Sequence, residues 1–200
     1  LLGLLERAAA QSDGDPASAA RVLPALAVGH CYHPDPAIAP QLLDRAERLA
    51  DGTGDPDVIA DVLIGRLITF SGVSTLSAAT LSWVQRLDSL RHSRSREDAV
   101  IANSVATMAA MNLGDVDGAR RHVQAGIAGS EELQLPVLRA QLRWMEAVLA
   151  VWVGDFAEAE RHHGIAAHVH EQTELYEAGS GLLATATLLR ERGGPVDASW

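Results

Sequence analysis

Apolar residues recur along this chain with the spacing of amphipathic helices. Residues 36–50 show the pattern, because one stripe holds the apolar side chains Ile38, Leu42, Leu43, Ala46 and Leu49. The second half of 135–153 is apolar almost all round, which predicts a helix packed between neighbours. No segment alternates apolar and polar residues as a half-buried strand does. The pattern therefore predicts an all-α protein.

Turn signals divide the chain into helices of similar length. Asp15 and Asp55 each precede a proline, which is typical of a helix N-cap followed by a first-turn proline. Ser95 and Asp98 have the spacing of a capping box. Together with glycines that interrupt the apolar pattern, these signals predict helices over 2–11, 16–30, 36–50, 56–71, 74–91, 96–113, 115–130, 135–153, 155–172 and 174–192.

The turn signals return about every 40 residues. Gly114 is followed by Gly154 forty residues later and by Gly193 after 39 more, and Gly72 lies 42 residues before Gly114. We expect each glycine to supply the left-handed residue that ends one helix before the next. Each period then holds two antiparallel helices, A and B. The repeat predicts one helical-repeat domain over residues 1–200, an internal piece of a longer chain with about four full helix pairs and a partial unit at each end.

The repeated turn resembles that of the tetratricopeptide repeat. The residues at matching spacings are Gly154, Asp155, Phe156, Ala159 and Ala166, and before them Gly114, Asp115 and Ala119. The period is longer than the family's usual length of about 34 residues. Large aromatic residues of the first helix are mostly replaced, for example by Ala147 and Ala150. The resemblance implies a right-handed α-solenoid of antiparallel helix pairs whose A helices line a concave face.

Long, Ala-, Leu- and Arg-rich repeats of this kind also resemble the helical-repeat region of large bacterial transcriptional regulators, the ATP-binding LuxR-type and SARP-type activators. That resemblance implies a non-catalytic interaction or sensing module that binds a peptide, a protein, a neighbouring domain or a small effector on the concave face. If tetratricopeptide geometry holds, the residues lining that face include Arg66, Thr69, Phe70, Ser104, Met108, Met111, Asn112, Gln141, Trp144, Trp152, Thr187 and Arg190.

Composition narrows the classes of partner. The formal net charge is −10, which argues against direct contact with nucleic acid by this piece. All 16 cationic residues are arginine, which excludes a Walker-A phosphate loop and Schiff-base lysine chemistry. The longest apolar run, 147–153, is too short to span a bilayer. We therefore expect a cytoplasmic module without membrane contact.

Four histidines on 155–172 are the most conspicuous chemical groups, namely His162, His163, His168 and His170. No pair has the i, i+4 spacing of a helical zinc site. We interpret them as a solvated polar face with Glu160 and Glu171 as partners. No hydrolase, metalloprotease or dinucleotide motif occurs, so we expect no enzymatic activity, metal or cofactor.

Two other interpretations stay open. In the first, the chain is a passive structural spacer or an oligomerisation scaffold in another multidomain protein. In the second, which is more remote, it is an enzyme with a catalytic set that no motif reveals. Leucines at both ends lack a partner helix in the repeat register, which predicts that the chain self-associates through an uncapped end or frays there. These leucines are Leu1, Leu2, Leu4, Leu5, Leu182, Leu183, Leu188 and Leu189.

Overall fold

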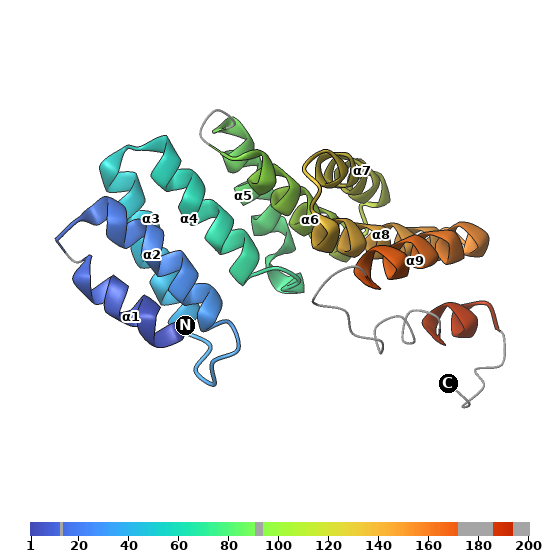
Figure 1. The fold of residues 1–200 in the computed structure, drawn as a ribbon, viewed down its shortest axis with the longest axis horizontal. Coiled ribbons are helices and arrows are strands. Elements are labelled where there is room, and N and C mark those ends of the chain that lie inside the picture. The colour runs from blue at the N-terminus through green and yellow to red at the C-terminus, as the bar shows by residue number, and fades with distance from the viewer. Residues whose placement is uncertain (13, 91–93, 172–185, 194–200) are drawn as a thin grey trace. The chain divides into compact units, whose positions relative to one another are not determined.

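The computed structural model describes residues 1–12, 14–90, 94–171 and 186–193, and within them no strand occurs (Figure 1). The helices are α1 (Leu2–Gln11), α2 (Pro16–Gly29), α3 (Ile38–Thr53), α4 (Pro56–Thr69), the 3-10 turn η1 (Ser74–Leu76), α5 (Ser77–Ser89), α6 (Arg96–Asn112), α7 (Val116–Glu132), α8 (Pro136–Trp152) and α9 (Phe156–Glu171). Residues 186–191 are also helical. The prediction of an all-α protein is confirmed. Among these helices, none is both long and apolar enough to cross a bilayer.

Helix bounds follow the local signals that predict them. Asp15 and Asp55 accept hydrogen bonds from the backbone N–H groups of Ala17 and Asp57, at 3.1 and 2.9 Å. Ser95 and Asp98 cap each other reciprocally, at 2.8 and 3.0 Å. Each side-chain acceptor satisfies a backbone donor that the first helical turn leaves unpaired.

The predicted left-handed glycines are confirmed. Gly72, Gly114, Gly154 and Gly193 have φ of 80°, 75°, 80° and 72°. A fifth such residue, Gly54 at φ 64°, ends α3 at Thr53, three residues beyond the expected end. The expected helix over 174–192 is described only from residue 186, and its earlier part lies outside the described residues.

The chain divides into two compact units, Leu1–Asp98 and Ala99–Trp200. In the first unit, α2 packs on α1, α3 and α4, and α4 also packs on α3 and α5. The approach of α2 to α4 is close because Gly65 faces Pro24; a Cβ atom on Gly65 would lie 2.2 Å from the Pro24 Cβ. The core between these helices contains Ala20, Leu23, Ala46, Ala50, Val58 and Val62. The expectation of one repeat domain over residues 1–200 stays a prediction.

The second unit is built around α8, which packs on α7 and α9. Its core joins residues of α6, α7 and α8, namely Val100, Ala110, Ala119, Val123, Ile127, Leu142, Met145 and Leu149. Glycines keep α7 close to its neighbours, because a Cβ on Gly126 would lie 2.9 Å from the Leu142 side chain and one on Gly129 2.8 Å from Val100. This packing holds one side of α8 against α7, and α9 covers another.

The apolar ends differ from one another. Leu1, the N-cap of α1, and Leu2 and Leu4 within α1 are exposed, as the repeat register leads us to expect. Leu188 is buried and clusters with Ala150 and Ala159 instead of forming an open face. Leu182 and Leu183 lie outside the described residues. Self-association through the ends stays a prediction.

Candidate functional site

Helix α8 carries two sides of different chemistry. At about 100° per residue, positions 146, 149, 150 and 153 fall on one side of the helix axis, and positions 141, 144, 148 and 152 fall on the opposite side. The first set lines a pocket with α7 and α9. The second set contains exposed apolar residues and three of the residues expected to bind a partner.

We name the second set, with Val137, the α8 stripe. Its members are Val137, Gln141, Trp144, Val148 and Trp152, spaced four or three residues apart so that they form one line along the helix. Val137, Val148 and Trp152 are 39%, 37% and 49% exposed, and Gln141 and Trp144 are half-buried. Exposed apolar residues normally occur singly, so their concentration on one helix face makes the α8 stripe a candidate contact surface.

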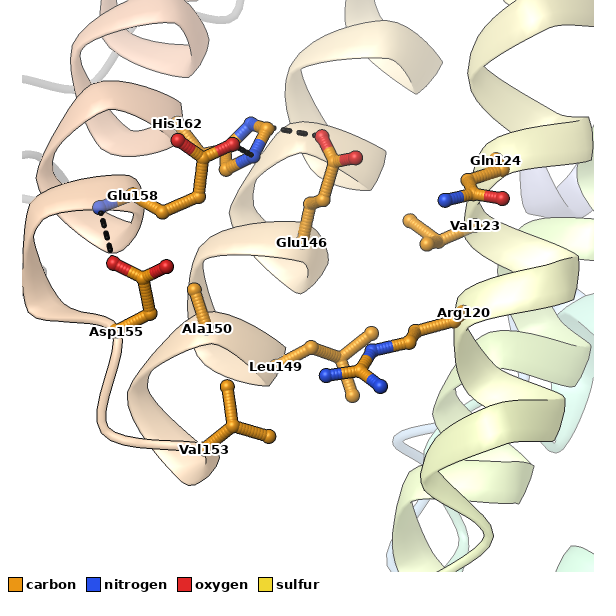
Figure 2. A pocket seen from close by; sticks show the side chains of 10 residues that line it. All are labelled: Arg120, Val123, Gln124, Glu146, Leu149, Ala150, Val153, Asp155, Glu158 and His162. Atoms are coloured by element: carbon orange, nitrogen blue, oxygen red, sulfur yellow. Dashed lines mark hydrogen bonds and ion pairs between the residues drawn. The ribbon is translucent and has the colours of Figure 1, made fainter.

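On the other side of α8, a pocket of about 170 Å³ lies between α7, α8 and the start of α9 (Figure 2). Its apolar lining consists of Val123, Leu149, Ala150 and Val153. Its polar lining consists of Arg120, Gln124, Glu146, Asp155, Glu158 and His162. Every lining residue belongs to the second unit, so the pocket is complete within one compact body.

His162 is the most buried polar group of the pocket, with only 3% of its surface exposed. Its Nδ1 lies 2.8 Å from Oε2 of Glu146, and its Nε2 lies 2.9 Å from Oε1 of Glu158. The Nδ1 contact is close but is not aligned as a hydrogen bond, so its attraction is electrostatic. The interpretation of His162 as part of a solvated face is therefore wrong. Glu160, the expected partner of His163 three residues later, instead pairs with Arg192 at 3.1 Å.

Two arginines neutralise the glutamates that flank His162. Arg161 donates to both oxygens of Glu158, and this ion pair is the main reason that the pKa of Glu158 falls to about 2; the charge of His162 lowers it further, while desolvation opposes the shift. Arg143 donates to Glu146 at 2.8 Å and to Glu131 of α7 at 3.0 Å. The ion pairs thus tie α7, α8 and α9 together around the pocket.

The neighbouring histidines have different surroundings. Half-burial lowers the pKa of the His163 imidazole below its ordinary value, and the nearby charge of His162 lowers it further. His168 is exposed, and the side chain of His170 lies outside the described part. Across the described residues, no three His, Cys, Asp or Glu side chains are placed to hold a metal ion together.

The expected binding residues of the first unit contribute to its packing. Arg66 is buried, donates to Asp44 of α3 at 2.8 Å, lies 3.1 Å from Glu47 and stacks 5.2 Å from the Trp83 ring centre. The Thr69 hydroxyl donates to the Gly65 carbonyl at 2.7 Å. Phe70 is half-buried, with its ring centre 5.9 Å from that of Trp83. These contacts engage Arg66, Thr69 and Phe70 inside their own unit.

The expected residues of the second unit lie in varied surroundings. On α6, Ser104 is buried, Met108 and Met111 are partly buried against the core, and Asn112 is exposed. In 186–193, Thr187 and Arg190 are exposed, and Arg190 pairs with Glu191. Gln141, Trp144 and Trp152 do share one helix face, in the α8 stripe. Sequence reasoning missed Val137 and Val148, although their helical spacing to these residues is a signal that finds them.

No protein-family model matches this chain, and no curated protein matches it either. The fold and the site therefore define only a structural class of protein. It is an all-α chain of successive helices, with an apolar stripe and a charged pocket on opposite sides of one helix.

Proposed function

We propose that the chain is a non-catalytic interaction module of a cytoplasmic, multidomain bacterial transcriptional regulator, and that it binds a protein or peptide partner through the α8 stripe. The α8 stripe is the observation that carries this proposal. It combines three exposed apolar residues with a second, half-buried tryptophan on a helix whose other sides are already packed or line the pocket.

The chemistry of the α8 stripe indicates the kind of partner. Tryptophan dominates the binding energy of many interfaces because its large ring buries much area with little loss of side-chain entropy. A partner helix with apolar residues at i, i+3, i+4 and i+7 matches the line of Val137, Trp144, Val148 and Trp152. The proposed partner segment is therefore an amphipathic helix, supplied by another protein or by another domain of the same chain.

The proposal includes a right-handed, tetratricopeptide-like α-solenoid with A helices on the binding face. Two features support this arrangement. Left-handed glycines recur at 72, 114, 154 and 193, once in each period of about 40 residues. In the first unit, α2 packs on both α3 and α4, as an A helix packs on its own B helix and on the next A helix.

Selection of binding peptides tests the proposal and does not require the natural partner. A phage library of random 16-residue peptides is panned against the chain, and the affinity of selected peptides is measured by fluorescence anisotropy. The change is Trp152→Glu, and the matched control is Val153→Glu. The two positions are adjacent and similarly exposed, at 49% and 52%, but Val153 lies on the pocket side.

We expect Trp152→Glu to weaken binding about thirtyfold or more, as the loss of an interface anchor does, and Val153→Glu to change it less than about threefold. Circular dichroism of both variants verifies that the helical content is kept. A failure to select peptides, or equal losses in the two variants, contradicts the proposal and favours a passive spacer.

A further inference from the structure

The pocket between α7, α8 and α9 has opposite charges on its two walls (Figure 2). From α7, Arg120 extends its guanidinium group toward Leu149, and across the pocket Glu146 and Glu158 gather around His162. Arg120 has a long ion pair with Asp117, 3.7 Å between exposed side chains. Such a pair is weak, because solvent screens it. The Arg120 guanidinium is therefore able to bind an anionic group inside the pocket.

The opposite wall offers carboxylate oxygens to a cation. Glu146 uses Oε2 to meet His162 and Arg143, and its Oε1 makes no hydrogen bond among the described residues. Asp155 uses Oδ1 to cap α9 through the Glu158 N–H, at 3.1 Å. An ammonium group, which has only donors, matches acceptors of this kind.

The total charge around the pocket selects against a simple ion. Three acidic residues line the pocket, Glu146, Asp155 and Glu158, and Arg143 and Arg161 pair with two of these three carboxylates. One net negative charge remains among these groups, across the pocket from the positive charge of Arg120. A small molecule with both charges and no net charge therefore fits better than an anion or a cation.

The apolar lining and the volume of the pocket limit the polarity and the size of the rest of the ligand. Val123, Leu149, Ala150 and Val153 form an apolar floor between the charged walls. The volume is about 170 Å³, and a cavity of about 150 Å³ holds a benzene molecule. A branched aliphatic side chain with a small charged head group fits this space, whereas a nucleotide or an oligosaccharide is too large.

We propose that this pocket binds a free α-amino acid with an aliphatic side chain. Its carboxylate pairs with Arg120, its ammonium group binds the Glu146 carboxylate, and its side chain lies on the apolar floor. The site is on the side of α8 opposite the α8 stripe, so the ligand and a partner would contact different side chains.

Isothermal titration calorimetry with L-leucine tests the proposal on the full chain. Two analogues remove one charge each: 4-methylpentanoate lacks the ammonium group, and 3-methylbutylamine lacks the carboxylate. We expect a dissociation constant of about 1 mM or below for L-leucine. Each analogue should bind about tenfold to hundredfold more weakly, because it loses one charge-assisted interaction.

Two substitutions with matched controls locate the site. Arg120→Gln should weaken L-leucine binding about tenfold or more, whereas Arg121→Gln, at an exposed position that does not line the pocket, should leave it unchanged. Val153→Trp should block the pocket, whereas Leu113→Trp should not. Val153 and Leu113 are equally exposed, and each directly precedes a left-handed glycine, but only Val153 lines the pocket.

The outcomes separate clearly. The proposal is supported if Arg120→Gln weakens L-leucine binding about tenfold or more, Val153→Trp blocks it and the two control variants keep it. Absence of saturable binding up to about 10 mM overturns it. Binding that is equal for L-leucine and the two analogues, or that all four variants retain, also overturns it, because the charged walls then do not recognise the ligand.

Discussion

Replacing Gly65 by alanine tests the closest helix contact of the first unit. The added Cβ would lie 2.2 Å from the Pro24 Cβ and 3.2 Å from the Pro24 Cα. These atoms belong to a ring and to the backbone, so they cannot rotate away and one helix must shift. Overpacking of this kind costs about 1–3 kcal/mol, and alanine regains about 1 kcal/mol of helix propensity. Since the obstacle is rigid, we expect a net loss of about 1–2 kcal/mol in the free energy of unfolding.

Urea unfolding followed by far-UV circular dichroism measures this loss. Gly52→Ala is the control in the same unit, because a Cβ there meets nothing within 4 Å and should stabilise α3 by about 0.5–1 kcal/mol. Gly126→Ala should change the free energy of unfolding by an intermediate amount, because its Cβ would meet the movable end of the Leu142 side chain at 2.9 Å. If Gly65→Ala stabilises the chain as Gly52→Ala does, the close approach of α2 and α4 is refuted.

Three further predictions concern backbone strain and pH. Gln134 has φ 55°, so Gln134→Gly should raise the free energy of unfolding by about 1 kcal/mol in the same urea assay. The lowered pKa of Glu158, about 2 against 4.5, makes wild-type stability fall as pH drops from about 4.5 to about 2, and Glu158→Gln should remove that part of the slope. The lowered pKa of His163 makes wild-type stability fall below about pH 6.5, and His163→Gln should flatten that decline.

Either pH prediction fails if the variant and the wild type keep parallel stability curves across the named range. In both cases the sign follows from linkage. The unfolded chain binds more protons than the folded chain wherever a folded-state pKa is lowered, so acid shifts the equilibrium toward unfolding. Thermal unfolding at several pH values checks both predictions.

Local signals are sufficient to predict where helices begin and end. The Asp15 and Asp55 caps and the glycines at 114 and 154 depend on residues within one turn of each other, so they can be read from the sequence. Gly54 carries the same signal, but it lies directly between Thr53 and the Asp55 cap, where the cap alone already marks the break. Bounds therefore agree with the structure within a few residues.

Contacts between helices cannot be predicted in this way. The repeat register places Arg66 on an open face, but it is buried because Asp44 and Glu47 of α3 and Trp83 of α5 meet it from two sides. Likewise, the Glu158–His162 spacing of four residues is visible in the sequence, whereas the approach of Glu146 requires the pairing of α8 with α9. Helical periodicity gives the face of a residue but not the register of its neighbours.

The indole ¹⁵N–¹H signals of the tryptophans test the central claim, partner binding by the α8 stripe, most directly. Trp→Phe variants assign the signals, and a peptide selected against the chain is then titrated into ¹⁵N-labelled protein. We predict that the Trp152 and Trp144 signals shift with one common dissociation constant, while the signal of Trp83 in the first unit stays in place. Unchanged Trp144 and Trp152 signals beside saturable peptide binding, or a shift of the Trp83 signal alone, would contradict partner binding by the α8 stripe.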